Sequence, residues 1–271
     1  SILGNTNDRT AANTTAEVQA IVNAYNAILG EANGALADAN TSINPTAGQY
    51  ATVGAEIGAA ASDAENLALL NDIVGSKTAS DVDTIAEINT LARIANAIQL
   101  TAANGTAAPA LSAVDFAALG LTGVTVDNLP AVLAAIKATP DDGSGVNTLS
   151  ALQGVVTTAA TAAASALTTI STAAQNDTAG TAPALADFTA AGVTGVDSSN
   201  LAAVSSALNS AGVNGTAADT TAEVQAIVNA FNAIKANADG TANNNATNPT
   251  QAQYAAIGVT GVSSANAESL L

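Results

Sequence analysis

The chain lacks several residue types that carry much of protein chemistry, because its 271 residues include no cysteine, histidine, methionine or tryptophan. Without cysteine there is no disulfide framework and no thiol nucleophile, and without histidine the commonest general base and metal ligand is missing. Serine is plentiful, but the sequence places no base beside one. We therefore expect no catalytic residue and no enzymatic activity.

Positive charge is also scarce, with 5 lysines and arginines against 22 aspartates and glutamates and a net charge of −17. The bases are scattered, whereas nucleic-acid binding needs a cluster of them, so we expect no nucleic-acid partner. An uncharged stretch, residues 143–176, is long enough to span a bilayer, but it is rich in threonine, serine and alanine. We interpret it as a buried helix and expect no membrane insertion.

Calcium is the one metal that this composition leaves open, because calcium takes oxygen ligands. The candidate ligands are Asp81, Asp83, Asp141 and Asp142. Helix capping and turn formation explain these acidic residues more simply than a metal does. We therefore expect no cofactor and keep calcium as a hypothesis for these four residues.

Aromatic residues make up only 2% of the chain, and all of them fall at two repeating positions. Four head similar segments: Tyr50, Phe116, Phe188 and Tyr254. The other two, Tyr25 and Phe231, lie in near-identical copies of one segment, residues 15–25 and 221–231. Such self-similarity is typical of repeat proteins, whose small units bury their apolar sides on one another. We expect the first four rings to be buried, each between its own repeat and a neighbouring one.

Each repeat contains the signals of three helices, and no segment alternates cleanly enough to be a strand. The third helix has apolar residues at helical spacing and begins with a capping box, as in Thr14 with Glu17. In one repeat this helix runs long, over 148–174. The first helix is short and ends at a glycine: Gly54, Gly120, Gly192 or Gly258. The sequence therefore predicts an all-α fold, a solenoid-like tandem array of about four three-helix repeats.

The repeat phase divides the chain into three whole repeats, 44–106, 107–178 and 179–247, and two partial ones. Residues 1–43 carry the third helix of a repeat, and 248–271 carry the first two. Each partial repeat leaves an apolar stripe, formed by Ile257, Val262, Leu270 and Leu271 at one end and by Val18, Ile21, Val22 and Tyr25 at the other. We expect the stripes to meet in a longer array, in a closed ring or between copies of the chain, and we favour a filament, formed either by addition of copies or as one continuous repeat array.

Three segments, residues 183–196, 200–204 and 219–231, resemble repeats in very large secreted bacterial surface proteins, the biofilm-associated and RTX-type adhesins. Through the internal repeats, this resemblance covers nearly the whole chain. It implies an extracellular, non-catalytic, structural role, and it transfers no functional residue. The β-sandwich modules and calcium-binding nonapeptides of those adhesins do not occur in this sequence.

The sequence thus predicts a structural repeat protein, located outside the cell or on its surface, whose partner is itself. Its copies would form a bacterial filament, stalk or sheath by head-to-tail stacking. Two alternatives stay open: an adhesin segment that binds a glycan or a partner protein, and a subunit of an S-layer. A binding face needs exposed aromatic rings or convergent polar groups, whereas the sequence pattern places the aromatic residues in helix cores.

Overall fold

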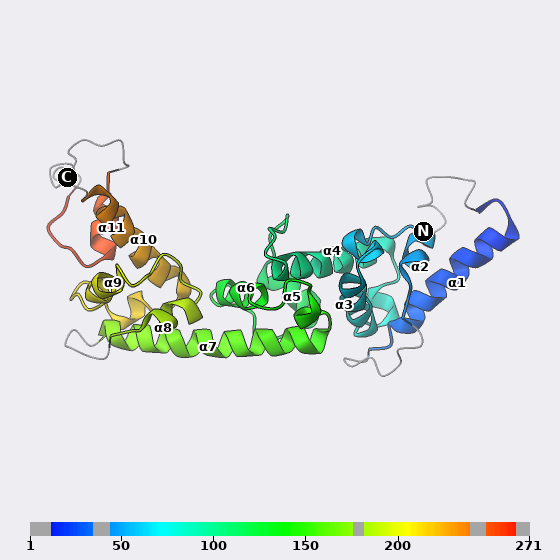
Figure 1. Ribbon diagram of the computed structural model, residues 1–271, viewed down its shortest axis with the longest axis horizontal. Coiled ribbons are helices and arrows are strands. Elements are labelled where there is room, and N and C mark those ends of the chain that lie inside the picture. Colours follow the sequence, from blue (N-terminus) through cyan, green and yellow to red (C-terminus); the bar gives the residue numbers. More distant parts are fainter. Residues whose placement is uncertain (1–11, 35–43, 176–181, 239–247, 264–271) are drawn as a thin grey trace. The chain divides into compact units, whose positions relative to one another are not determined.

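A computed structural model describes residues 12–34, 44–175, 182–238 and 248–263 of the chain (Figure 1). These residues form eleven α-helices joined by turns and short 3-10 segments, and they contain no strand. One isolated bridge pairs Asn33 with Thr78. The all-α prediction is therefore confirmed. The predicted boundaries of the repeats stay a prediction.

The chain forms two compact units, which we describe separately. Unit 1 comprises Ser1–Val124 and Leu133–Thr157, and unit 2 comprises Thr125–Val132 and Thr158–Leu271. Two helices contribute residues to both units: α6 (Leu129–Lys137) and α7 (Leu149–Gln175).

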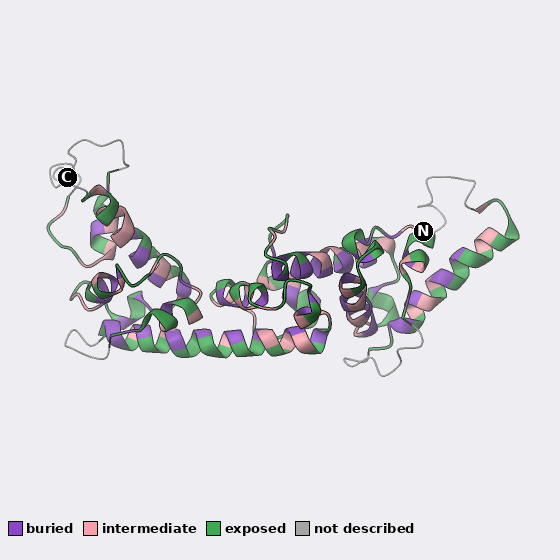
Figure 2. Cartoon of the chain, in the orientation of Figure 1, coloured by how far each residue is buried: buried purple, intermediate pink, exposed green. Residues whose placement is uncertain are grey.

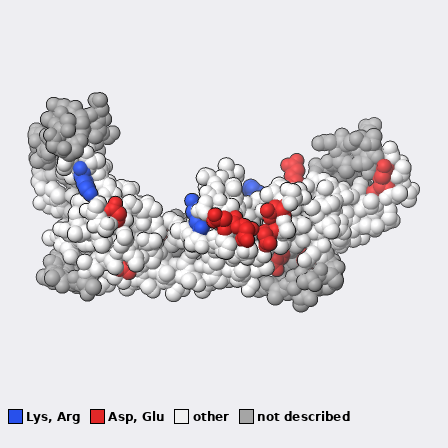
Figure 3. Space-filling view, viewed as in Figure 1, with Lys and Arg blue, Asp and Glu red and all other residues white. Residues whose placement is uncertain are grey.

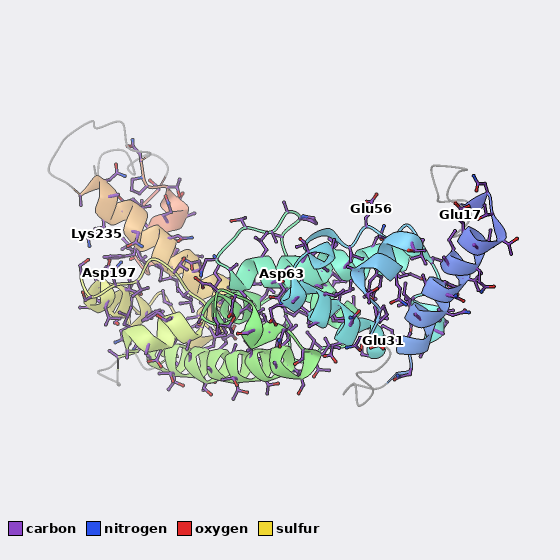
Figure 4. The ribbon with its side chains drawn as sticks, turned by 45° about the vertical axis from the view of Figure 1, so that its right-hand side comes forward. Glu17, Glu31, Glu56, Asp63, Asp197 and Lys235 are labelled. Atoms are coloured by element: carbon purple, nitrogen blue, oxygen red, sulfur yellow. The ribbon has the colours of Figure 1, made fainter. Side chains whose placement is uncertain are left out.

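Unit 1 begins with a long helix followed by a short one. Its helices are α1 (Thr15–Glu31), α2 (Ala47–Thr52), α3 (Ala64–Gly75), α4 (Ile85–Ala102) and α5 (Ala113–Ala118), followed by the first part of α7 (Figure 1). Helix α2 packs on α1, and α3 packs on α4. Burial of Tyr50 raises the pKa of its hydroxyl, and the nearby Glu31, which is labelled in Figure 4, raises it further.

Unit 2 repeats the same order of short, middle and long helices. It contains α8 (Leu185–Ala190), α9 (Leu201–Leu208), α10 (Thr221–Asn237) and α11 (Gln251–Ala256), together with the second part of α7. Helices α9 and α11 both pack on α10. The core of unit 2 gathers residues of α7, α8, α9 and α10 around Phe188.

Local signals explain where these helices begin and end. The expected capping boxes are present, for example at Thr14 and Thr220, whose hydroxyls accept from the N–H groups of Glu17 and Glu223. Each short helix ends at a glycine with a left-handed backbone, with φ of 80°, 86°, 76° and 79° at Gly54, Gly120, Gly192 and Gly258. The chain therefore turns at the same place in each copy.

The rings at the head of the short helices are buried as predicted. Tyr50, Phe116 and Phe188 are 0% exposed and Tyr254 is 8% exposed. Phe188 lies in a core that includes Ile170 of the preceding long helix, so this ring sits between two predicted repeats. The rings at the other repeating position are half-buried, and Tyr25 is one of them.

Helix α7 confirms the expected long helix but corrects its expected burial. By length and composition it is the one helix of the described residues that qualifies as a membrane span, yet only 28% of its most apolar window is buried. The buried residues follow one side: Leu149, Leu152, Val156, Ala159, Ala163, Ala166 and Ile170. The other side exposes small residues (Figure 2), and the Thr168 hydroxyl there donates to the carbonyl of Ala164 in its own helix. An expectation based on low charge alone missed this division.

Candidate interface at the repeat junction

The turns that follow the short helices α2, α5 and α8 are each held by a side chain of the next long helix. In unit 2, Gln225 of α10 spans the peptide groups of Thr194. The Thr194 N–H donates to Gln225 Oε1 at 2.8 Å, and Gln225 Nε2 donates to the Thr194 carbonyl at 3.0 Å. We call this pair of hydrogen bonds the polar clasp. It satisfies two backbone groups that the turn leaves without helical partners.

The polar clasp recurs in unit 1. Gln153 of α7 accepts from the Thr122 N–H and donates to the Thr122 carbonyl, both at 3.0 Å. The sequence separation is 31 residues in both complete clasps. In α4 the shorter Asn89 makes half of it, accepting from the Glu56 N–H at 2.8 Å. Three long helices therefore use the same position for one task.

An asparagine seven residues, about two turns, further along the long helix holds the next carbonyl of the turn. Asn232 Nδ2 donates to the Gly195 carbonyl, and Asn96 Nδ2 donates to the Ile57 carbonyl, each at 2.9 Å. Asn200 Nδ2 also donates to Gly195, at 2.8 Å. A turn carbonyl at this position thus accepts from two side chains.

Apolar contacts accompany the clasp. The residue before each clasped threonine is buried: Leu121 is 7% and Val193 is 6% exposed. On the long helices, Val156 and Val228 are 0% exposed. Beside the clasp of unit 1 lies a hollow of about 430 Å³, lined by residues 119–122 and by Leu149, Ser150, Gln153 and Thr157. Its lining contains neither a charged nor an aromatic side chain.

Helices α1 and α10 have nearly the same sequence but differ in burial. Val224 and Val228 of α10 are 0% exposed. At the same positions of α1, Val18 is half-buried and Val22 is 43% exposed. The side of α10 that faces the α8 turn and α9 is therefore buried, whereas the same side of α1 is more exposed within the described residues.

The turn after α11 shows the complementary exposure. Val259 occupies the place of Val193 and Leu121, yet it is 41% exposed. Thr260 occupies the place of Thr194, and within the described part of the chain its peptide groups have no hydrogen-bond partner. Helix α1 and the turn after α11 thus expose valines whose counterparts in α10 and in the turn after α8 are buried.

The four residues that the sequence analysis assigned to the α1 stripe differ in their exposure. Val18 is half-buried and Val22 is 43% exposed. Ile21 is only 4% exposed, so its assignment to an open stripe is wrong. Ile227 at the same position of α10 is equally buried, which shows that this side of the helix is covered within the chain. Tyr25 is half-buried, and its hydroxyl donates to the Asp83 carbonyl at 2.9 Å, so it is engaged inside unit 1.

The stripe at the other end is only partly visible. Ile257 is half-buried and packs against the core of unit 2, and Val262 is half-buried too. Leu270 and Leu271 lie outside the described residues. The sequence analysis missed Val259, a large apolar residue at this end that is 41% exposed.

Two of the calcium candidates, Asp81 and Asp142, make local capping and turn hydrogen bonds. Thr78 donates from its N–H and its hydroxyl to Asp81, which holds the pKa of Asp81 below its ordinary value. Asp142 accepts in the same way from Ser144, with the same effect on its pKa. Asp141 accepts from Asn104 Nδ2. The described residues hold no group of three acidic side chains arranged for a metal.

The basic side chains on the face shown in Figure 3 are dispersed. On the face shown in Figure 3, lysine and arginine side chains stand at separate places. Arg93 pairs with Asp115, and Lys235 lies near Asp197 on unit 2 (Figure 4). Hydrogen bonds from Ser199 lower the pKa of Asp197, and the charge of Lys235 adds to that effect. These charges stabilise local structure and gather into no basic patch on that face.

The clasp residues form a recurring contact that the sequence analysis missed. A glutamine follows the threonine of the turn at a constant interval, and Gln19 stands at the clasp position of α1. That recurrence is visible in the sequence.

No protein-family model matches the chain, and no curated protein or solved structure is detectably similar to it.

Proposed function

We propose that the chain is a structural protein whose copies stack head to tail into a filament, stalk or sheath outside a bacterial cell. One observation carries the proposal: α1 and α10 share a sequence, but only α10 has its valine face covered. On α10 the cover comes from the turn after α8 and from α9. The sequence counterpart of the α8 turn is the exposed turn after α11.

The exposed groups supply a driving force for this contact. Val22 and Val259 are 43% and 41% exposed, and fully burying a valine side chain stabilises by about 1.5 to 3 kcal/mol. Completing the burial of each is therefore worth roughly 1 kcal/mol, and the polar contacts add to it. A contact between different ends of identical chains that does not close into a ring grows into an open filament.

Burial of the aromatic rings favours this structural role over glycan binding. Tyr50, Phe116 and Phe188 are fully buried, so these rings offer no platform for stacking on a sugar. A solenoid arrangement of the helix triplets follows from the same proposal, because the contact between copies would repeat the junction inside each chain. The extracellular location is supported by the resemblance of the repeats to secreted bacterial surface proteins.

Negative-stain electron microscopy of the purified chain tests the proposal. The parent chain should form long uniform fibres, and Val259→Asp should give dispersed particles, because a carboxylate would be buried in the new junction. Val126→Asp is the matched control, since Val126 is 82% exposed and lies outside the junction. Dispersed particles of the parent chain at every concentration, or fibres of Val259→Asp like those of the parent, would overturn the proposal.

A further inference from the structure

The exposed side of α1 carries one half of a further polar clasp. Gln19 stands where Gln225 stands in α10, and its Nε2 donates to Asn23 Oδ1 at 2.9 Å, as Gln225 donates to Asn229 at 2.8 Å. This bond orients the Gln19 amide. A glutamine amide has a second Nε2 hydrogen and an acceptor oxygen, which are the two groups that Gln225 uses on its turn.

Burial separates Gln19 from its counterparts. Gln225, Gln153 and Asn89 are each half-buried beneath the turn that they hold, whereas Gln19 is exposed. Thr15 shows the same difference, because its counterpart Thr221 is 4% exposed and donates its hydroxyl to a carbonyl at the end of α8. Gln19 and Thr15 of α1 therefore match Gln225 and Thr221 of α10 in position, but among the described residues no turn is bound to them.

We infer that Gln19 of one chain clasps Thr260 of a second copy, with Oε1 accepting from the Thr260 N–H and Nε2 donating to the Thr260 carbonyl. This inference rests on the proposed head-to-tail stacking and adds the contact that sets its register. Both partners are at the right places in the repeat, since Thr260 follows Val259 in the turn after α11 as Thr194 follows Val193 after α8.

Asn26 extends the clasp along the same helix. It occupies the place of Asn232 and Asn96, is exposed where they are half-buried, and donates Nδ2 to the Gly261 carbonyl of the second copy. The corresponding carbonyl of Gly195 accepts from two asparagines within unit 2. A bond from Asn26 therefore adds to any other contact that Gly261 makes.

The clasp sets the register because the apolar contact alone selects it weakly. The facing surfaces are made of valine and small residues, which pack in more than one alignment at similar cost. A shifted alignment would bury the N–H and C=O of Thr260 without partners, and an unpaired buried polar group is costly. Only the alignment that places Gln19 on Thr260 satisfies both groups.

Two measurements test the clasp on the full chain. The first is the concentration at which the chain assembles, determined by sedimentation, for Gln19→Leu and Gln19→Ala. Loss of the two hydrogen bonds should raise that concentration about tenfold. Gln225→Leu, the same change in the clasp inside unit 2, should lower the melting temperature and leave the assembly concentration within about twofold of the parent value.

The second measurement reports the contact directly. The chain has no cysteine, so Gln19→Cys and Thr260→Cys chains can be mixed and treated with a short bismaleimide. They should form a covalent dimer that neither variant forms alone. A chain with both Thr194→Cys and Gln225→Cys, at positions that are hydrogen-bonded in the structure, should cross-link internally. This control shows that the cross-linker can span a clasp.

The outcomes separate the clasp from the assembly itself. A tenfold weaker assembly of both Gln19 variants, together with the mixed dimer, supports the clasp. If the parent chain assembles but Gln19→Leu assembles at the same concentration, or the mixture gives no dimer while the internal control cross-links, the clasp is wrong and the stacking stands. A parent chain that stays monomeric throughout overturns both.

Discussion

A matched pair of valine substitutions tests whether the α1 face is open in a single chain. Val22→Ala and Val228→Ala remove the same two methyl groups from the same position of nearly identical helices. Val228 is 0% exposed, and each buried methyl group contributes about 0.8 kcal/mol, so its loss should cost about 2 kcal/mol once the residual cavity is included. Val22 is 43% exposed, and its loss should cost less than about 1 kcal/mol.

Urea unfolding followed by circular dichroism measures both free energies, at a concentration where the parent chain is dispersed. The chain has two compact units, which can unfold in separate transitions. For each variant, the free energy of unfolding is therefore compared with that of the parent chain for the unit that carries the substitution. An equal cost for both variants would refute the reasoning, since it would show that α1 is already covered in the dispersed chain. Under assembling conditions, Val22→Ala should show its full cost as a higher assembly concentration.

Four further substitutions test the fold and its caps. Phe188→Ala should cost about 3 to 5 kcal/mol in urea unfolding, because the ring is 0% exposed, and a cost below about 1 kcal/mol would contradict that burial. Gly192→Ala should be more destabilising than Gly120→Ala: both have a left-handed backbone, but an added Cβ lies 2.6 Å from a backbone nitrogen at Gly192 and meets nothing within 4 Å at Gly120. Equal melting temperatures would refute this. Thr78→Ala should raise the pKa of Asp81 toward its ordinary value in an NMR titration, because the Thr78 hydroxyl stabilises the carboxylate. That stabilisation is present above the ordinary pKa and is lost as the pH falls through the lowered pKa. An unchanged pKa of Asp81 in the variant would contradict this prediction.

Local features of the fold follow directly from the sequence. Capping boxes and helix-ending glycines act over a few residues, so their chemistry is readable without the tertiary structure. The start of α1 at Thr15 and the turn at Gly192 are examples. The burial of the short-helix rings was also predictable, because aromatic residues are so scarce here that their recurrence marks the core positions.

Burial that depends on neighbouring repeats could not be predicted from local sequence. Val22 and Val228 stand in the same sequence context, yet one is exposed and the other buried. Ile21 follows the same helical pattern as Val18 but faces a side covered within the chain. The half-exposed α7 shows the same limit, since absence of charge does not determine which side of a helix packs.

The polar clasp could be predicted from the sequence only in part. Its glutamines recur at a constant distance from the turn, but a glutamine on a helix has many uses, and the sequence alone does not connect Gln225 to Thr194. The structure supplies that connection twice in full and once in part. Once it is known, the sequence places Gln19 and Thr260 at the same two positions.

The measurement that tests head-to-tail stacking most directly is a mixing experiment between Val22→Asp and Val259→Asp chains. Each variant blocks one end of the chain and leaves the other end able to bind. Sedimentation velocity should show monomers of either variant alone, and equimolar mixing should give one-to-one dimers that do not grow. A mixture that stays monomeric while the parent chain assembles, or growth of either variant alone, would contradict stacking through these two ends.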